Sequence, residues 1–232
     1  MQLWLCPLVA FLLGSVPFGL LIAKARGVDI RQHGSGNIGA TNVLRVLGKK
    51  FGIPCLLLDI LKGFVPTLLA INLIRFAGQP MGMGIPALVE WAYVFPAERQ
   101  FTAQLLQVVT GLCAILGHNY SPWVAFKGGK GIATSAGVVI ALMPAAIVIL
   151  VLVWVLLFLT TRYVSVASIA AVVVLPVLTL HGSWHHGRLQ DGTWNKPLFA
   201  LSLMIAIMGV WKHRANIQRL LAGTEHRFER KR

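Results

Sequence analysis

The chain has 232 residues and a formal net charge of +14 at pH 7; 56% of its residues are hydrophobic and only 12% are charged. This composition leaves too little polar surface for a soluble globule of this size and predicts an integral membrane protein in contact with the lipid bilayer. Because the basic residues lie in loops and in the tail, beside apolar runs, we expect them to bind anionic lipids and phosphates, and we expect no nucleic acid partner.

Six apolar segments are candidates for crossing a hydrocarbon layer of about 30 Å. In chain order they are residues 3–23, 52–76, 103–117, 132–160, 164–181 and 197–211. The first has no preceding basic region, and its only small-residue stretch lies mid-run, which is typical of a retained helix and not of a signal peptide. Pro17 and Gly19 are tolerable within it because neighbouring helices can satisfy the freed backbone groups.

The basic residues also predict the orientation. They cluster in the first loop (Lys24, Arg26, Arg31, Arg45, Lys49, Lys50) and in the tail (Lys212, Arg214, Arg219, Arg227, Arg230, Lys231, Arg232), and both clusters should be cytoplasmic. Six crossings would place them on opposite faces. Residues 132–160 would form a helix of roughly 43 Å, too long for one untilted crossing, and Pro144 can divide it. We therefore predict an all-α bundle of seven transmembrane helices with the amino terminus outside.

The segment Met81–Phe95 is the other candidate for the missing crossing. It contains two glycines, Pro86 and Glu90, and as a crossing it would move residues 117–134 to the outer face. We interpret it as an interfacial or re-entrant excursion.

Three polar segments interrupt the apolar sequence. The first segment, residues 34–45, contains Gly34-Ser35-Gly36-Asn37-Ile38-Gly39-Ala40-Thr41-Asn42 and then Arg45. Its glycines allow backbone N–H groups to approach a ligand, its hydroxyls and amides add donors, and an arginine can clamp a phosphate with two hydrogen bonds. The alternative is a simple glycine turn between membrane helices.

The second segment, residues 117–134, places Gly128-Gly129-Lys130-Gly131 just before an apolar helix. A helix start with free N–H groups is a favourable anion site. It is not a Walker A loop, because Gly131 stands where Ser or Thr should follow Lys130. His118 is interpreted as a hydrogen-bonded structural group, with a proton shuttle as the alternative.

The third segment, residues 213–225, predicts a helix end closed by Gly223 at a C-cap position. His213 and Asn216 are three residues apart and should share one face of that helix.

Other features point to structural roles. Cys6, Cys55 and Cys113 are isolated in apolar sequence and predict small buried side chains, and no cluster of Cys, His or carboxylates suggests a metal or a cofactor. Asp59 and Lys62 lie one helical turn apart and should pair within the membrane. The spacing from His186 to Asp191 matches the H-x4-D pattern of thioester-dependent glycerolipid acyltransferases, but no companion motif follows, and we interpret it as a chance match.

Together the three segments resemble the signature motifs of the bacterial acyl-phosphate:glycerol-3-phosphate acyltransferases, in order and over nearly the whole chain. The matching residues are Ser35-Gly36-Asn37, Gly39-Ala40-Thr41-Asn42 and Arg45; Gly117-His118, Gly128-Gly129-Lys130-Gly131 and Ala133-Thr134; and His213, Asn216-Ile217, Arg219-Leu220, Gly223 and Glu225. The resemblance implies transfer of an acyl group from acyl phosphate to the 1-hydroxyl of glycerol 3-phosphate, giving lysophosphatidic acid in phospholipid synthesis.

The resemblance also implies seven helices in a bacterial plasma (inner) membrane, cytoplasmic motifs, and a functional link to the soluble enzyme that makes acyl phosphate. The chain would be one acyltransferase domain over residues 1–232, with an insertion at 78–102 and a cytoplasmic basic tail at 213–232. By this resemblance the catalytic residues would be Arg45, Lys130, Ser168, His213 and Asn216. The remaining substrate-binding residues would be Ser35, Gly36, Asn37, Gly39, Thr41, Asn42, His118, Gly128, Gly129, Gly131, Thr134, Arg219 and Glu225.

The chemistry of an acyl phosphate requires no acyl-enzyme, because phosphate is already a good leaving group, and no Ser or Cys has an evident His–acid relay. The hydroxyl proton could go to a substrate phosphate oxygen, to His118 or to His213. Ser168, at the start of a membrane helix, has a structural alternative as a backbone-bonded serine. The alternative function is a transporter of an organic phosphate, which predicts polar groups in both leaflets and an internal repeat.

Overall fold

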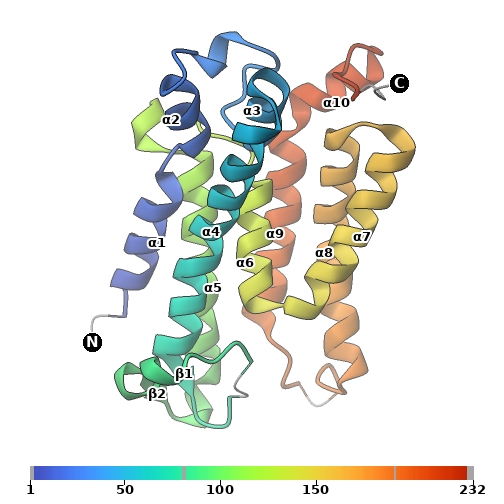
Figure 1. The fold of residues 1–232 in the computed structure, drawn as a ribbon. Helices are drawn as coiled ribbons and strands as arrows, with labels where there is room; N and C mark the ends of the chain where they lie inside the picture. Colours follow the sequence, from blue (N-terminus) through green and yellow to red (C-terminus); the bar gives the residue numbers. More distant parts are fainter. Residues whose placement is uncertain (1–2, 80–81, 191, 229–232) are drawn as a thin grey trace. The chain divides into compact units, whose positions relative to one another are not determined.

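The computed structural model describes residues 3–79, 82–190 and 192–228, and its architecture is almost entirely helical (Figure 1). The helices are α1 (Leu5–Ser15), α2 (Phe18–Lys24), α3 (Ala40–Leu47), α4 (Lys49–Leu73), α5 (Gln100–Asn119), α6 (Ile132–Leu142), α7 (Pro144–Thr161), α8 (Val164–His185), α9 (Lys196–Lys212) and α10 (Arg214–Leu221). Short 3-10 turns cover Ile30–Gln32, Pro86–Trp91, Ala97–Arg99 and Pro122–Val124. The helices form two compact units, residues 1–143 and 144–232.

The predicted membrane helices are present. Five spans are long and apolar enough to cross a bilayer: Leu5–Lys24, which joins α1 and α2, then α4, a span around α5 at Ala97–Val124, α7 and α8. The pair α9 and α10, bent by 52°, makes a sixth. As expected, residues 132–160 divide at Pro144, where α7 begins. Seven crossings stay a prediction, since the 11 residues of α6 extend only about 16 Å.

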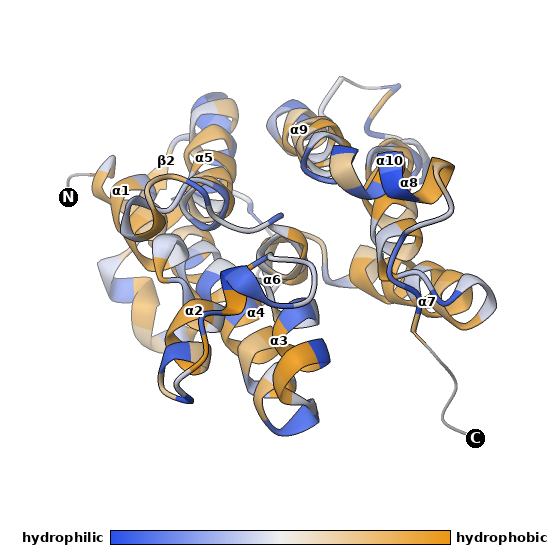
Figure 2. Ribbon diagram, turned by 90° about the horizontal axis from the view of Figure 1, so that it is seen from above, coloured by the Kyte–Doolittle hydropathy of each residue, from blue (hydrophilic) through white to orange (hydrophobic). Residues whose placement is uncertain are grey.

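In the first unit α4 packs against α6, and α1 packs against α5 (Figure 2). Small residues allow this close approach: a Cβ atom at Gly14 would collide with the Ala114 backbone, and one at Gly63 would collide with the carbonyl of Thr134. Membrane helices commonly use glycine in this way, because dispersion contacts and not water exclusion hold them together.

The break between α1 and α2 at Pro17 is satisfied by other parts of the first unit. The Ser121 hydroxyl donates to the carbonyl of Ser15 at 2.6 Å, and the Lys62 ammonium donates to the carbonyl of Val16 at 2.9 Å. The expectation that neighbouring segments would satisfy the backbone groups freed at Pro17 is therefore confirmed.

Two short strands were not predicted. β1 (Ile74–Phe76) and β2 (Tyr93–Phe95) pair in parallel, and Ile74 and Phe95 are buried against Ala70 and Ala103. Three-residue strands leave no periodic signal in the sequence, and their pairing depends on a contact across the intervening segment. Met81, the first residue of the predicted excursion, lies outside the described residues; the described part of that excursion is a 3-10 turn followed by β2.

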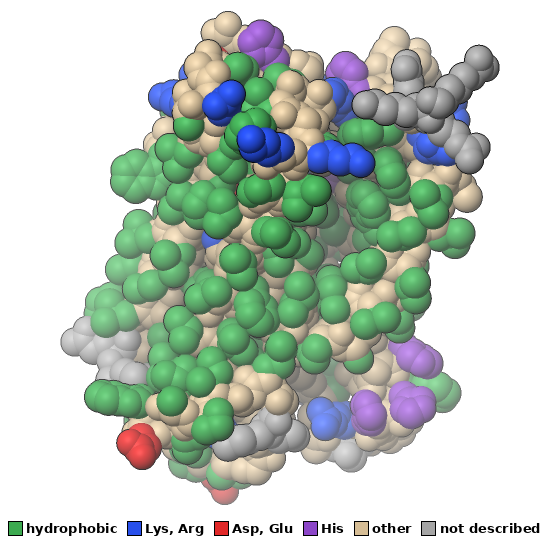
Figure 3. Space-filling view, in the orientation of Figure 1, with side chains coloured by type: hydrophobic (Ala, Val, Ile, Leu, Met, Phe, Trp, Pro, Cys, Tyr) green, Lys and Arg blue, Asp and Glu red, His purple; other side chains and the backbone are tan. Residues whose placement is uncertain are grey.

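In the second unit α7 and α9 each pack against α8. The exposed face of α7 carries large apolar side chains (Val148, Ile149, Val151, Leu152, Val155, Leu156 and Leu159), as expected of a lipid-facing helix. In the first unit, Lys and Arg side chains gather around the end that carries α2 and α3, and hydrophobic side chains cover the helices along their length (Figure 3).

Candidate active site

Asn42 organises the first segment from the first turn of α3. Its side chain is 1% exposed. The amide oxygen accepts a hydrogen bond from the Ser35 N–H at 2.9 Å, and the amide nitrogen donates to the carbonyls of Ile30, His33 and Asn37 at 3.2, 2.9 and 2.9 Å. These four bonds engage both N–H donors of the side-chain amide, one of them shared between two carbonyls, and one of the two acceptor positions of its oxygen. In the structure, Asn42 therefore holds the loop in position, whereas the resemblance implies that it contacts the substrate.

The rest of the first segment presents its polar groups at the start of α3. The Asn37 side chain accepts a hydrogen bond from the Gly39 N–H at 2.8 Å, and Gly39 caps the helix. Gly34 and Gly36 have φ angles of +59° and +69°, a conformation that side chains rarely adopt. Ser35 and Thr41 are half-buried, so their hydroxyls lie at the surface of the loop.

The glycines of the second segment fit against the end of α5. A Cβ atom at Gly128 would collide with the His118 carbonyl, and one at Gly129 would collide with the His118 ring. Gly131 has a φ of +82°, and a Cβ atom there would lie 2.6 Å from the Asn119 side-chain oxygen. The sequence analysis placed these glycines at a helix start that favours an anion; their fit against His118 and Asn119 adds a packing reason that no local pattern contains.

Lys130 and Arg45 are the basic residues of the first two segments that the resemblance assigns to catalysis. Lys130 is half-buried immediately before α6, and Arg45 is half-buried in the last turn of α3. Thr134, by contrast, is fully buried in the first turn of α6, where its carbonyl faces Gly63 of α4. The Thr134 hydroxyl is also buried, which indicates a packing position, and substrate contact through this hydroxyl stays a prediction.

The predicted pair of Asp59 and Lys62 forms. The Lys62 ammonium lies 2.7 Å from an Asp59 carboxylate oxygen, and both side chains are at most 4% exposed. The same oxygen lies 3.6 Å from Nδ1 of His118, which is 6% exposed. His118 is therefore a buried member of a charged cluster, and both its structural interpretation and its role toward substrate stay predictions.

In the third segment Glu225 is the common hydrogen-bond acceptor. One carboxylate oxygen accepts from the Asn216 amide at 2.6 Å and from the Ser165 hydroxyl at 2.9 Å, and the other accepts from the Arg219 guanidinium at 2.8 Å. Burial by itself raises the pKa of Glu225, but the bonds from Asn216, Arg219 and Ser165 outweigh burial and leave the pKa below its usual range. Glu225 is thus held as a carboxylate.

The chain turn that brings Glu225 back is a Schellman motif. The Gly223 N–H donates to the Leu220 carbonyl at 3.2 Å, and the Thr224 N–H donates to the Arg219 carbonyl at 2.8 Å. Gly223 has a φ of +68°. The predicted C-cap is confirmed, because this pair of bonds requires a left-handed residue just past the helix end.

His213 and Ser168 are both buried. His213 lies at the bend between α9 and α10, and its Nδ1 is 2.7 Å from the Gly209 carbonyl, which leaves Nε2 on the opposite side of the ring. The Ser168 hydroxyl accepts a hydrogen bond from the Trp154 indole at 3.1 Å. Sequence reasoning did not assign a role to Ser165 or Trp154, because the tertiary contacts that bring Ser165 to Glu225 and Trp154 to Ser168 have no sequence signal.

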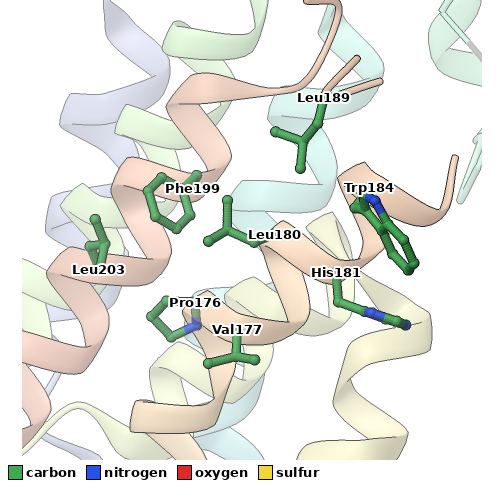
Figure 4. Close-up of a pocket in the computed structure, with 8 residues that line it drawn as sticks. All are labelled: Pro176, Val177, Leu180, His181, Trp184, Leu189, Phe199 and Leu203. Carbon is green, nitrogen blue, oxygen red and sulfur yellow. The ribbon is translucent and has the colours of Figure 1, made fainter. Parts of the chain in front are cut away.

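An apolar pocket of about 490 Å³ in the second unit is a poor phosphate site (Figure 4). Its lining residues are Pro176, Val177, Leu180, His181, Trp184, Leu189, Phe199 and Leu203. It lies along the second half of α8, away from Ser165 and Ser168 at the start of that helix. The nearby H-x4-D match ends at Asp191, which lies outside the described residues.

The structure therefore brings the predicted residues together in two groups. The first and second segments belong to one unit, and the third segment, with Ser165 and Ser168, belongs to the other. Each group includes one carboxylate, Asp59 beside Lys62 and His118 in the first unit and Glu225 beside Asn216, Ser165 and Arg219 in the second.

Comparison with known proteins identifies relatives over nearly the whole chain. The family model described as glycerol-3-phosphate acyltransferase matches residues 4–223. A glycerol-3-phosphate acyltransferase of Aquifex aeolicus (strain VF5) is 41% identical over 94% of this chain and 95% of its own length, and one of Geobacter metallireducens is 43% identical over 95% of this chain and 94% of its own length.

Solved structures agree with these relatives. The glycerol 3-phosphate form of PlsY (YgiH), an integral membrane glycerol 3-phosphate acyltransferase, matches with a TM-score of 0.77 and 37% identity, covering 99% of this chain and 96% of that one. The lysophosphatidic acid form of the same protein matches with a TM-score of 0.73.

Proposed function

The chain belongs to the glycerol-3-phosphate acyltransferase family, and from this premise we propose that it transfers a fatty acyl group from acyl phosphate directly to the 1-hydroxyl of glycerol 3-phosphate. The observation that carries the proposal is that the family match spans residues 4–223, which includes the first two polar segments and residues 213–223 of the third. As a member, the chain is a multi-pass membrane acyltransferase of phospholipid biosynthesis. The transporter alternative has no comparable support.

The reaction needs positioned charges more than a nucleophilic side chain. The glycerol oxygen attacks the acyl carbonyl carbon, the bond from that carbon to the phosphate oxygen breaks, and the hydroxyl proton leaves to an oxygen of the substrate phosphate. The protein must hold two anions close together and stabilise charge on the carbonyl oxygen and the departing phosphate. Backbone N–H groups, amides and basic side chains meet these needs.

We assign the acyl phosphate to the first two segments, through Ser35, Asn37, Thr41 and the backbone of residues 128–131. Glycerol 3-phosphate is assigned to Arg45, Lys130, Ser168, His213 and Asn216, following the family resemblance. The hydrogen bonds described above refine this assignment: Asn42 and Glu225 act as positioning residues, and Thr134 acts in helix packing. Because Nδ1 of His213 faces the Gly209 carbonyl and therefore donates, Nε2 of the neutral ring is an acceptor suited to the substrate hydroxyl.

The donor experiment tests the proposal directly. Purified protein is supplied with labelled glycerol 3-phosphate and, in turn, with acyl phosphate, acyl-CoA and acyl-carrier protein. We expect product from acyl phosphate alone. Product formed from acyl-CoA at a comparable rate would contradict the assigned donor while leaving the family membership intact.

Lys130→Ala and Asn216→Ala should abolish turnover in protein that remains folded. Lys196→Ala is the matched control, because it removes an exposed lysine at the start of α9, outside the three segments. Normal activity in either motif variant would contradict the residue assignment.

Topology is tested separately. We propose an external amino terminus, cytoplasmic motif segments and carboxyl terminus, and supply of acyl phosphate by a soluble enzyme. Single cysteines at positions 37, 130 and 216 should react with a membrane-impermeant thiol reagent from the same side. Reaction from different sides would overturn this arrangement.

A further inference from the structure

A buried charged cluster in the first unit has no part in the reaction proposed above. Asp59 and Lys62 of α4 are 2% and 6% exposed, and they pair at 2.7 Å. Moving two charges into an apolar helix bundle costs free energy that the pairing only partly recovers, and an apolar pair of similar volume is often as stable. The contacts of the cluster indicate what else it does.

One set of contacts leads to the second segment. Asp59 faces Nδ1 of His118 at 3.6 Å. The His118 carbonyl accepts the Gly129 N–H at 3.1 Å, and its ring leaves no room for a side chain at Gly129. His118 thus lies between the carboxylate and the glycine loop, so its position sets the position of the loop.

A second set of contacts leads to the first segment. The Lys62 ammonium holds the Val16 carbonyl at the α1–α2 break and lies 5.5 Å from the Phe18 ring centroid. At Gly19 in α2, an added Cβ atom would collide with the carbonyl of Ile38, which lies between Asn37 and Gly39 of the first segment. Asp59, Lys62, His118, Phe18 and Ile38 line one small internal pocket.

We propose that Asp59 and Lys62 are positioning residues that fix the first and second segments relative to each other. Asp59 places the second segment through His118, and Lys62 places the first segment through the Val16 carbonyl and α2. The inference rests on the proposed function for its kinetic consequence, because those segments are assigned to the substrates. The structural consequence, a fixed position of the two segments, is independent of the proposed function.

The test separates positioning from stability with a charge-neutral double variant. Asp59→Asn removes the carboxylate that pairs with Lys62, and Lys62→Met removes the ammonium that pairs with Asp59; each should lower the Tm in detergent by about 10 °C. Asp59→Asn/Lys62→Met removes both charges and should regain most of that Tm. Because a misplacement of about 1 Å costs about 100-fold in rate, the double variant should still show a fall of that order in kcat/KM, with a raised KM for acyl phosphate.

Two outcomes overturn the proposal. If the double variant regains both Tm and activity, the pair is structural only. If hydrogen exchange at residues 126–131 is unchanged in the double variant, the cluster does not position the loop, whatever the activity. Hydrogen exchange needs no substrate, so faster exchange in these residues supports the positioning role by itself. An inactive wild-type protein with acyl phosphate would count against the proposed function alone.

Discussion

Two carboxylates organise the polar segments, and they do so in different surroundings. Asp59 lies inside a helix bundle and faces a lysine and a histidine. Glu225 lies beyond the last helix and accepts hydrogen bonds from Asn216, Ser165 and Arg219. The carboxylate of Asp59 is stabilised by charge pairing, because no solvent can replace its partners. The carboxylate of Glu225 is stabilised by the number of hydrogen bonds that it accepts, and its contribution to stability depends on pH.

The largest effect should come from steric disruption beside Asp59. Gly129→Ala places a methyl group against the His118 ring, so either the loop or the buried histidine must move. We expect a loss of kcat/KM of about 100-fold or more, as for a displaced reactive group. Steady-state kinetics on folded protein check this.

The matched control is Gly182→Ala in α8, where an added Cβ atom meets nothing within 4 Å. It should leave activity unchanged and, as an alanine in a helix, should not destabilise the protein. Equal losses in the two variants would refute the steric account.

The next effect concerns Glu225. Glu225→Ala leaves three donors without their acceptor, a cost of about 2 kcal/mol or roughly 30-fold in affinity for glycerol 3-phosphate if Asn216 is released. Glu225→Gln keeps one acceptor oxygen and loses the ion pair to Arg219, so its loss should be several-fold smaller. Calorimetric binding of glycerol 3-phosphate distinguishes the two, and equal losses would mean that charge, and not acceptor count, holds the segment.

The same region can be loosened in the wild-type protein by lowering the pH. Because the pKa of Glu225 is lower in the folded protein than in the unfolded chain, its stabilising contribution is complete above the unfolded value of about 4.5 and is lost as pH falls through the folded value. The protection factors for hydrogen exchange of Thr224 and Phe228, whose N–H groups bond to the carbonyls of Arg219 and Arg162, should fall over that range. Glu225→Gln should lack this pH dependence.

The smallest effect is expected at Trp154. Trp154→Phe keeps a ring near Phe158, where the centroids are 5.1 Å apart, but removes the hydrogen bond to Ser168. One neutral hydrogen bond contributes about 1 kcal/mol, or about fivefold, so the KM for glycerol 3-phosphate should rise by no more than that. Trp184→Phe, which changes an exposed indole, should leave the KM unchanged, and a matching rise there would argue against a role for the Trp154–Ser168 bond.

Several features of this protein follow from the sequence by itself. The apolar spans, the division at Pro144, the Gly223 cap and the pair of Asp59 and Lys62 are confirmed. Each depends on residues within one or two helical turns, where spacing, proline and glycine act directly on the backbone. The three polar segments are visible for the same reason, as short breaks in long apolar runs.

Tertiary structure decided the rest. The contact of His118 with Asp59, the fit of Gly129 against His118, the bond from Ser165 to Glu225 and the pairing of β1 with β2 each join residues far apart in the chain. Local patterns carry no information on which helix faces which. That choice is made by close packing, where glycine surfaces allow backbones to touch and each buried polar group must find a partner.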